Sequence, residues 1–148
     1  MKLFDLGGLW NAYKENENTI YKVKVPGSWN ETEGLETYIG TLIYNKKFTL
    51  DKSDTNKNIE LLMSGIYRES EIILNGENIA YHYGYQAPFK LDVTEFIKEG
   101  ENELVIKASN KDKFPEISNA DLFKINPLKI SGIYENIYLE ISEKVKIN

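Results

Sequence analysis

The chain has 148 residues, 41% of them apolar, and a formal net charge of −5 at pH 7. It contains no cysteine and one histidine, His82, which excludes disulfides, thiolate chemistry and metal sites built from several histidines or cysteines. The acidic balance argues against nucleic acid as a partner, and no run approaches the ~20 apolar residues of a membrane span. The amino terminus lacks the apolar stretch of a signal peptide, so we expect a cytoplasmic protein unless a leader has been removed.

Apolar and polar residues alternate along most of the chain, which is typical of strands with one buried face. Strands are predicted at residues 21–25, 42–50, 59–63, 70–74, 79–81, 103–108 and 136–141. Asn75-Gly76 lies between two apolar runs and predicts a hairpin with a type I′ turn. One short helical turn is expected at 94–98, after a cap at Thr94 and before Gly100. This pattern predicts an all-β sandwich or jelly roll, formed as one domain over residues 1–148.

Two segments do not fit the regular strand pattern. Residues 111–127 have no clear period and contain Pro115 and Pro127, which predicts a long loop of the kind that is often functional. Residues 143–148 look like the start of a further strand, so we expect them to begin the link to another domain.

The sequence offers no recognisable catalytic set. His82 is the only histidine available as a base for a nucleophile, and no Gly-x-Ser-x-Gly elbow accompanies it. Glycoside hydrolysis needs two carboxylates held across a bond, and the sequence pairs no two of its acids. Asp51 and Asp54, or Asp112, leave a calcium site open, although solvated turns explain them more simply. We therefore predict no catalytic centre, no cofactor and no metal on this chain.

An aromatic run follows the predicted hairpin, in which Tyr81, His82, Tyr83, Tyr85 and Gln86 lie close together. Aromatic rings stack on sugar rings, and amide and imidazole groups bind hydroxyls, so the run suits carbohydrate. The alternative for each tyrosine is ordinary packing in the sandwich, and for His82 a structural hydrogen bond. Trp10 and Trp29 are interpreted first as core or edge anchors and second as sugar contacts.

Four blocks in a fixed order resemble the N-terminal domain shared by β-galactosidases, β-glucuronidases and β-mannosidases of glycoside hydrolase family 2. They are Leu6–Trp10 with Val25–Asn30, then Gly40, Tyr44 and Phe48, then Gly65–Leu104 with its Leu74-Asn75-Gly76 and Gly100-Glu101-Asn102, and finally Ser131–Tyr134 with Ile137–Leu139. The resemblance covers nearly the whole chain. It implies a galactose-binding-like jelly roll, with the catalytic carboxylates on a separate barrel domain.

The resemblance also implies a sugar contact on the loop before the last block. The position six residues before Gly132, often aspartate in the family, is Asn126 here, and the aromatic position two residues later is Leu128. Asn126 still donates and accepts hydrogen bonds but holds no charge. The family's Arg-Asp after the last tyrosine is replaced by Glu135-Asn136.

Three functions follow as hypotheses. The first is a non-catalytic accessory domain of a family 2 glycosidase, with a β-glycoside sugar and the other domains of that enzyme as partners. The second is an independent carbohydrate-binding module with its own aromatic site. The third is a structural or protein-interaction sandwich. The predicted carbohydrate-binding residues are Trp29, His82, Tyr83, Tyr85, Gln86 and Asn126.

Overall fold

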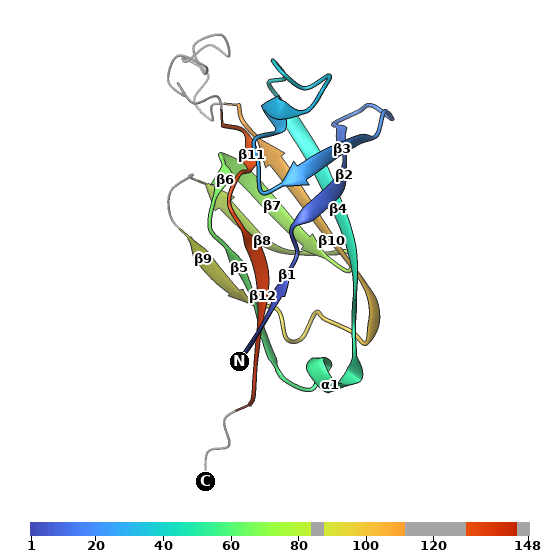
Figure 1. Ribbon diagram of the computed structural model, residues 1–148, viewed down its shortest axis with the longest axis vertical. Coiled ribbons are helices and arrows are strands. Elements are labelled where there is room, and N and C mark those ends of the chain that lie inside the picture. Colours follow the sequence, from blue (N-terminus) through green and yellow to red (C-terminus); the bar gives the residue numbers. More distant parts are fainter. Residues whose placement is uncertain (84–87, 112–129, 145–148) are drawn as a thin grey trace.

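The computed structural model describes residues 1–83, 88–111 and 130–144, and its two main antiparallel sheets pack face to face (Figure 1). The all-β jelly-roll sandwich predicted from the sequence is confirmed. In spatial order, the six-stranded sheet contains β3 (Tyr21–Val25), β2 (Gly8–Lys14), β4 (Thr41–Leu50), β10 (Gly100–Ser109), β7 (Glu69–Leu74) and β8 (Glu77–Tyr83).

The second sheet has four strands, and a third sheet has two. The four-stranded sheet contains β1 (Lys2–Asp5), β12 (Ile137–Ser142), β5 (Asn58–Met63) and β9 (Phe89–Asp92). The two-stranded sheet contains β11 (Gly132–Ile133) and β6 (Ile66–Tyr67). The helices of the described residues are η1 (Trp29–Glu31) and α1 (Lys52–Thr55), and neither is long and apolar enough to cross a membrane.

All seven predicted segments form strands, and the bounds of 21–25 are reproduced by β3. Strand β2 was not predicted because its outward face carries an apolar residue, Leu9, which is 64% exposed and obscures the alternation. The expected helical turn at 94–98 is a hydrogen-bonded turn in which Phe96 N donates to Val93 O. Asp92 caps this turn in place of Thr94, since its Oδ1 accepts from Thr94 N at 3.0 Å.

The hairpin prediction at Asn75-Gly76 is confirmed. Both residues have positive φ, 49° and 84°, as a type I′ turn requires. The Asn75 side chain also leaves the turn and joins neighbouring strands, because its Oδ1 accepts from Glu103 N and its Nδ2 donates to Asn102 Oδ1, both at 2.9 Å. Asn102 is fully buried and further bonded to the backbone of residues 98 and 100, so its amide is satisfied.

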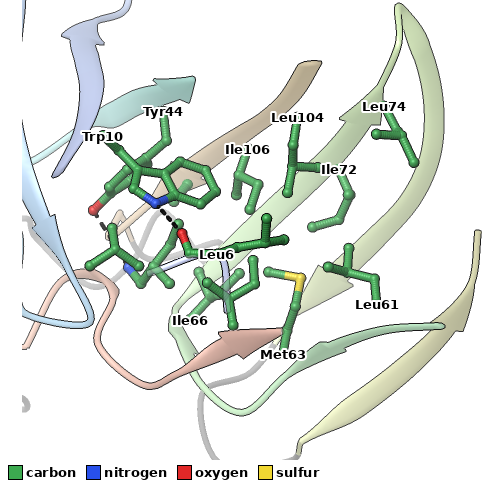
Figure 2. Close-up of a cluster of buried hydrophobic side chains, with 14 of the residues drawn as sticks. Leu6, Trp10, Tyr44, Leu61, Met63, Ile66, Ile72, Leu74, Leu104 and Ile106 are labelled. Carbon is green, nitrogen blue, oxygen red and sulfur yellow. Dashed lines mark hydrogen bonds between the residues drawn. The ribbon is translucent and has the colours of Figure 1, made fainter. Parts of the chain in front are cut away.

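The core lies between the two sheets and is formed by the inward residues of both (Figure 2). Trp10 is fully buried, packs edge-on against Tyr44 with centroids 6.1 Å apart, and donates from Nε1 to Leu6 O at 2.8 Å. The labelled neighbours in this cluster are Leu61, Met63, Ile66, Ile72, Leu74, Leu104 and Ile106. Trp10 is therefore a core anchor, as interpreted from the sequence.

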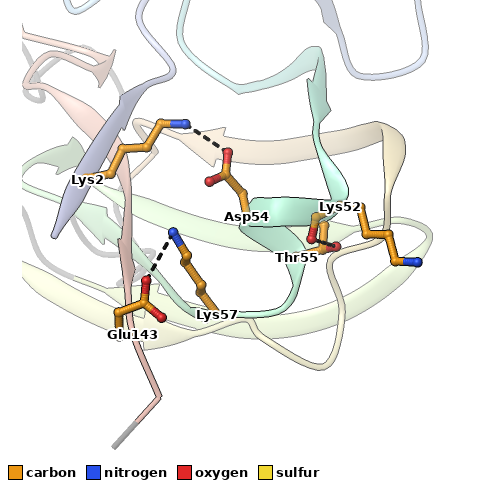
Figure 3. Close-up of polar contacts among 6 residues, drawn as sticks. All are labelled: Lys2, Lys52, Asp54, Thr55, Lys57 and Glu143. Carbon is orange, nitrogen blue, oxygen red and sulfur yellow. Dashed lines mark hydrogen bonds and ion pairs between the residues drawn. The ribbon is translucent and has the colours of Figure 1, made fainter.

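Two ion pairs hold the end of the sandwich at which β1 begins and β12 leaves (Figure 3). Lys2 Nζ lies 2.9 Å from Asp54 Oδ2, and the Asp54 side chain is only 7% exposed. Lys57 Nζ lies 3.3 Å from Glu143 Oε1. Asp54 thus already has a cation as its partner, and among the described residues no group of three or more acids or histidines is arranged to hold a metal.

Candidate functional site

The candidate site is the base from which residues 112–129 depart after β10 and to which they return before β11. Asn110 and Ser131, one at each end, are both buried, and Asn110 Nδ2 donates to Ser131 Oγ at 3.0 Å. The same amide donates to Tyr38 O at 2.9 Å, and its Oδ1 accepts from Gly40 N at 2.9 Å. A buried amide with every group satisfied holds its neighbours firmly, so Asn110 fixes where the segment begins and ends.

A turn at Ser28 forms the second support of this base. Ser131 N donates to Ser28 Oγ at 3.0 Å, and Trp29 N donates back to Ser131 O at 2.9 Å. Ser28 also caps η1 by accepting from Asn30 N at 3.3 Å. The Ser28–Trp29 and Ser131 segments, about a hundred residues apart in sequence, are therefore joined by reciprocal bonds.

Glycine is required at position 132 because the backbone there passes close to two aromatic side chains. Its φ is 81°, and a Cβ atom there would collide with Tyr44 Oη and come within 2.9 Å of Trp29 Cε3. Ile133 N donates to the same Tyr44 hydroxyl at 3.4 Å, and complete burial raises the pKa of Tyr44 far above its ordinary value. Only glycine lets the backbone pass this close to both rings.

Trp29 does not contact solvent, which corrects its prediction as a sugar contact. Its side chain is 0% exposed, its centroid lies 5.6 Å from that of Tyr38, and its Nε1 donates to Tyr38 O at 3.4 Å. A fully covered ring cannot stack on a sugar in this structure. The other interpretation, a packing anchor, is correct, because the Trp29 ring packs against Tyr38 and lies beside Gly132 at the base.

His82 and Tyr83 are neighbours on β8 that point to opposite faces. His82 stacks on Phe89 with centroids 4.5 Å apart, and burial lowers its pKa below the ordinary value. Its Nδ1 is buried, as is the Oγ of Ser70 directly opposite in register, and neither has a hydrogen-bond partner in the described structure. Because Ser70 is 1% exposed, it is not a nucleophile that a substrate can reach. Tyr83 is 36% exposed.

The remaining predicted contacts lie outside the described residues. Tyr85, Gln86 and Asn126, together with the family position Leu128, fall in 84–87 and 112–129. Their assignment as sugar contacts stays a prediction.

Arg68, the only arginine of the chain, was missed by the sequence reasoning. Its backbone N donates to Ser109 O at 2.8 Å, and its Cζ lies 5.5 Å from the ring of Tyr67 and 5.8 Å from that of Tyr83. Tyr67 is opposite Gly132 in the β6–β11 pair, so this guanidinium lies beside the base. The resemblance placed the family's arginine after Tyr134, whereas this one lies between β6 and β7.

The structure brings together two acids that the sequence did not pair. Glu60 and Glu140 lie opposite each other in the β5–β12 pair, on the outer face of the four-stranded sheet. Lys90 Nζ lies 3.6 Å from Glu140 Oε2. An open sheet face does not enclose a sugar as a catalytic cleft does. Asp92, whose pKa is lowered by hydrogen bonds from Thr94, is an exposed turn cap and a poor general acid.

A comparison with protein families finds one model over residues 5–142, described as the sugar-binding domain of glycosyl hydrolases family 2. The chain belongs to this family. The β-galactosidase of Thermoanaerobacter pseudethanolicus is 31% identical to this family 2 domain over 103 residues, which are 66% of the chain and 13% of that protein. A β-glucuronidase of Formosa agariphila is 26% identical over 151 residues, 89% of the chain and 15% of that protein.

Among solved structures, the β-D-mannosidase from Dictyoglomus thermophilum matches with a TM-score of 0.80 and 24% identity, covering 97% of this chain and 23% of that one. This confirms the galactose-binding-like fold that the resemblance implied. The family 2 domain spans only about a seventh of the length of the two curated relatives above.

Proposed function

We propose that this family 2 domain is a non-catalytic part of a β-glycosidase, and that residues 112–129 help to shape a sugar site whose catalytic carboxylates lie on another domain. The observation that carries the proposal is the rigid base. Asn110 and Ser131 join the two ends of the segment by a hydrogen bond, and Ser28 is hydrogen-bonded to Ser131. The buried ring of Trp29 lies against Gly132 beside them. A site is precise when rigid elements hold it, and this end of the sandwich supplies such a support.

The partner sugar is proposed to be a β-glycoside, because the relatives are β-galactosidases and β-glucuronidases. Asn126 is the residue of this chain that we propose as the sugar contact, with its amide donating to or accepting from a hydroxyl. A neutral hydrogen bond of this kind contributes about 1 kcal/mol, and more when its loss leaves a buried group unpaired.

Hydrolysis of p-nitrophenyl β-galactoside, β-glucuronide and β-mannoside tests the proposal in two arms. The chain alone is expected to release no nitrophenol above buffer. In the longer protein that contains it, Asn126→Ala is expected to lower kcat/KM about tenfold, which corresponds to about 1.4 kcal/mol. Asn18→Ala, at an exposed position between β2 and β3, is the matched control and should leave kcat/KM unchanged.

Two results would overturn the proposal. Turnover by the chain alone would show that it carries its own catalytic centre. An unchanged kcat/KM after both Asn126→Ala and replacement of residues 112–129 by a Gly-Ser linker would show that the segment does not contribute to the site.

A further inference from the structure

Two exposed tyrosines share the outer face of an edge strand. Tyr81 and Tyr83 lie on β8, the last strand of the six-stranded sheet, and are 51% and 36% exposed. Alternate residues of a strand point to the same face, so both rings lie outside the sandwich, while His82 between them packs inward on Phe89. Large rings exposed as neighbours mark an interaction site more often than rings exposed singly.

A carboxylate stands beside each ring. In the β7–β8 pair, Glu71 is opposite Tyr81 and Glu69 is opposite Tyr83, and residues opposite each other have Cβ atoms about 5 Å apart on one face. Asn78 Nδ2 donates to Glu71 Oε2 at 3.2 Å and so fixes one of these acids. The strand therefore repeats a ring-and-acid unit with a spacing of about 7 Å.

The orientation of one ring is supported from the side. Arg68 Cζ lies 5.8 Å from the centroid of Tyr83 and 5.5 Å from that of Tyr67, which is 4% exposed. A guanidinium held between two rings limits how far Tyr83 turns. Tyr83 thus loses less freedom on binding than an unsupported surface tyrosine would.

We propose that these five residues bind a neutral carbohydrate chain that lies along β8. They are Glu69, Glu71, Asn78, Tyr81 and Tyr83, called here the tyrosine strip. Successive sugar rings stack on the two tyrosines, and their hydroxyls donate to the two carboxylates and exchange hydrogen bonds with the amide. The strip adds a second sugar-contacting surface to the domain, which the proposed function does not require.

The chemistry of the strip decides between possible occupants. Glu69 and Glu71 are balanced by two cations, since Lys107 lies opposite Glu71 in the β10–β7 pair and Arg68 lies beside Tyr83. The strip therefore has no net positive charge to attract an acidic glycan, and its two carboxylates would repel one. A hydrophobic protein partner suits aliphatic side chains better. The exposed aliphatic residues lie elsewhere, at and just before β1, on β2 and just before β3; they are Met1, Leu3, Leu9 and Ile20. Rings flanked by hydrogen-bond acceptors match a neutral polyhydroxylated chain best.

Affinity electrophoresis of the 148-residue chain tests the proposal, with native gels that contain galactomannan, xyloglucan, β-1,4-galactan or polygalacturonate. At least one neutral polysaccharide is expected to slow the chain, and polygalacturonate is not. Tyr81→Ala and Tyr83→Ala should each weaken the binding about tenfold. Tyr138→Ala, on β12 of the other sheet, is the matched control and should bind like the parent. Glu69→Gln with Glu71→Gln should admit polygalacturonate.

Three outcomes would overturn the tyrosine strip. They are no retardation by any neutral polysaccharide, retardation by polygalacturonate alone, and equal retardation of the parent and the Tyr81→Ala/Tyr83→Ala double variant. Self-association that disappears in the double variant, without any effect of polysaccharide, would assign the strip to a protein contact instead. Tyr81→Ala should leave hydrolysis of aryl glycosides by the longer protein unchanged, so the failure of either proposal is distinguishable from that of the other.

Discussion

Replacement of Gly132 by alanine is expected to destabilise the domain strongly, through two effects that can be separated. The first is backbone strain, because φ is 81° and an L-residue in this region costs roughly 1 kcal/mol. The second is overpacking against Tyr44 Oη and Trp29 Cε3, which costs about 1–3 kcal/mol in a well-packed core. Together they lower the free energy of unfolding by about 3 kcal/mol.

Gly100 provides the control for the strain alone. Its φ is 89°, and a Cβ atom there would meet nothing within 4 Å. Gly100→Ala should therefore cost only about 1 kcal/mol in urea unfolding followed by tryptophan fluorescence. Tyr44→Phe removes the hydroxyl that the new methyl group would strike, so it should recover part of the loss in Gly132→Ala. Equal losses for Gly132→Ala and Gly100→Ala, within about 0.5 kcal/mol, would refute the packing argument.

Three further changes have defined outcomes. Asn110→Ala removes the bonds at the base of the candidate site and leaves buried groups unpaired, so urea unfolding should show a loss of about 3 kcal/mol. Burial lowers the pKa of His82, so the imidazole of the unfolded chain binds a proton at a higher pH than that of the folded chain. The free energy of unfolding should therefore decline as the pH falls below 6.5. NMR titration can follow this imidazole without ambiguity because the chain has a single histidine. Lys2→Met leaves Asp54 buried without its cation and should cost about 1–2 kcal/mol, whereas Lys57→Met should cost under about 0.5 kcal/mol in the same unfolding assay.

Each of these has a result that contradicts it. Asn78→Ala, at an exposed amide, should leave the free energy of unfolding nearly unchanged. A loss as large as that of Asn110→Ala would show that the hydrogen bonds of Asn110 contribute no more to stability than those of a surface amide. An imidazole that titrates at or above pH 6.5 would mean that His82 is not desolvated. Equal effects of Lys2→Met and Lys57→Met would mean that the burial of Asp54 does not matter.

The fold was predictable because most strands bury one face and expose the other. Residues 21–25 and 103–108 alternate cleanly, and the Asn75-Gly76 turn requires positive φ that few other pairs supply. Strands that carry apolar residues on the exposed face were not predicted, as in β2, where Leu9 points outward. The two-residue strands β6 and β11 are too short to show any period.

The candidate site was predictable only in part, because burial and long-range partners decide it. Trp29 reads as an aromatic beside a turn, and only packing against Tyr38 and Gly132 shows that it is covered. Asn110 carries no local signal at all, since its partners lie at residues 38, 40 and 131. The placement of His82 and Tyr83 on opposite faces could have been predicted, because successive side chains of a strand point to opposite faces.

The hydrogen bond between Asn110 and Ser131 allows the length and sequence of residues 112–129 to vary independently of the sandwich. Once both ends are fixed by the framework, doubling the number of residues between them costs only about 0.6 kcal/mol in closure entropy. Substitutions and insertions within 112–129 can thus accumulate without disturbing the core. Under the proposed function, the same framework would present new segments to new sugars, and a segment grafted between these two anchors would test whether specificity changes with it.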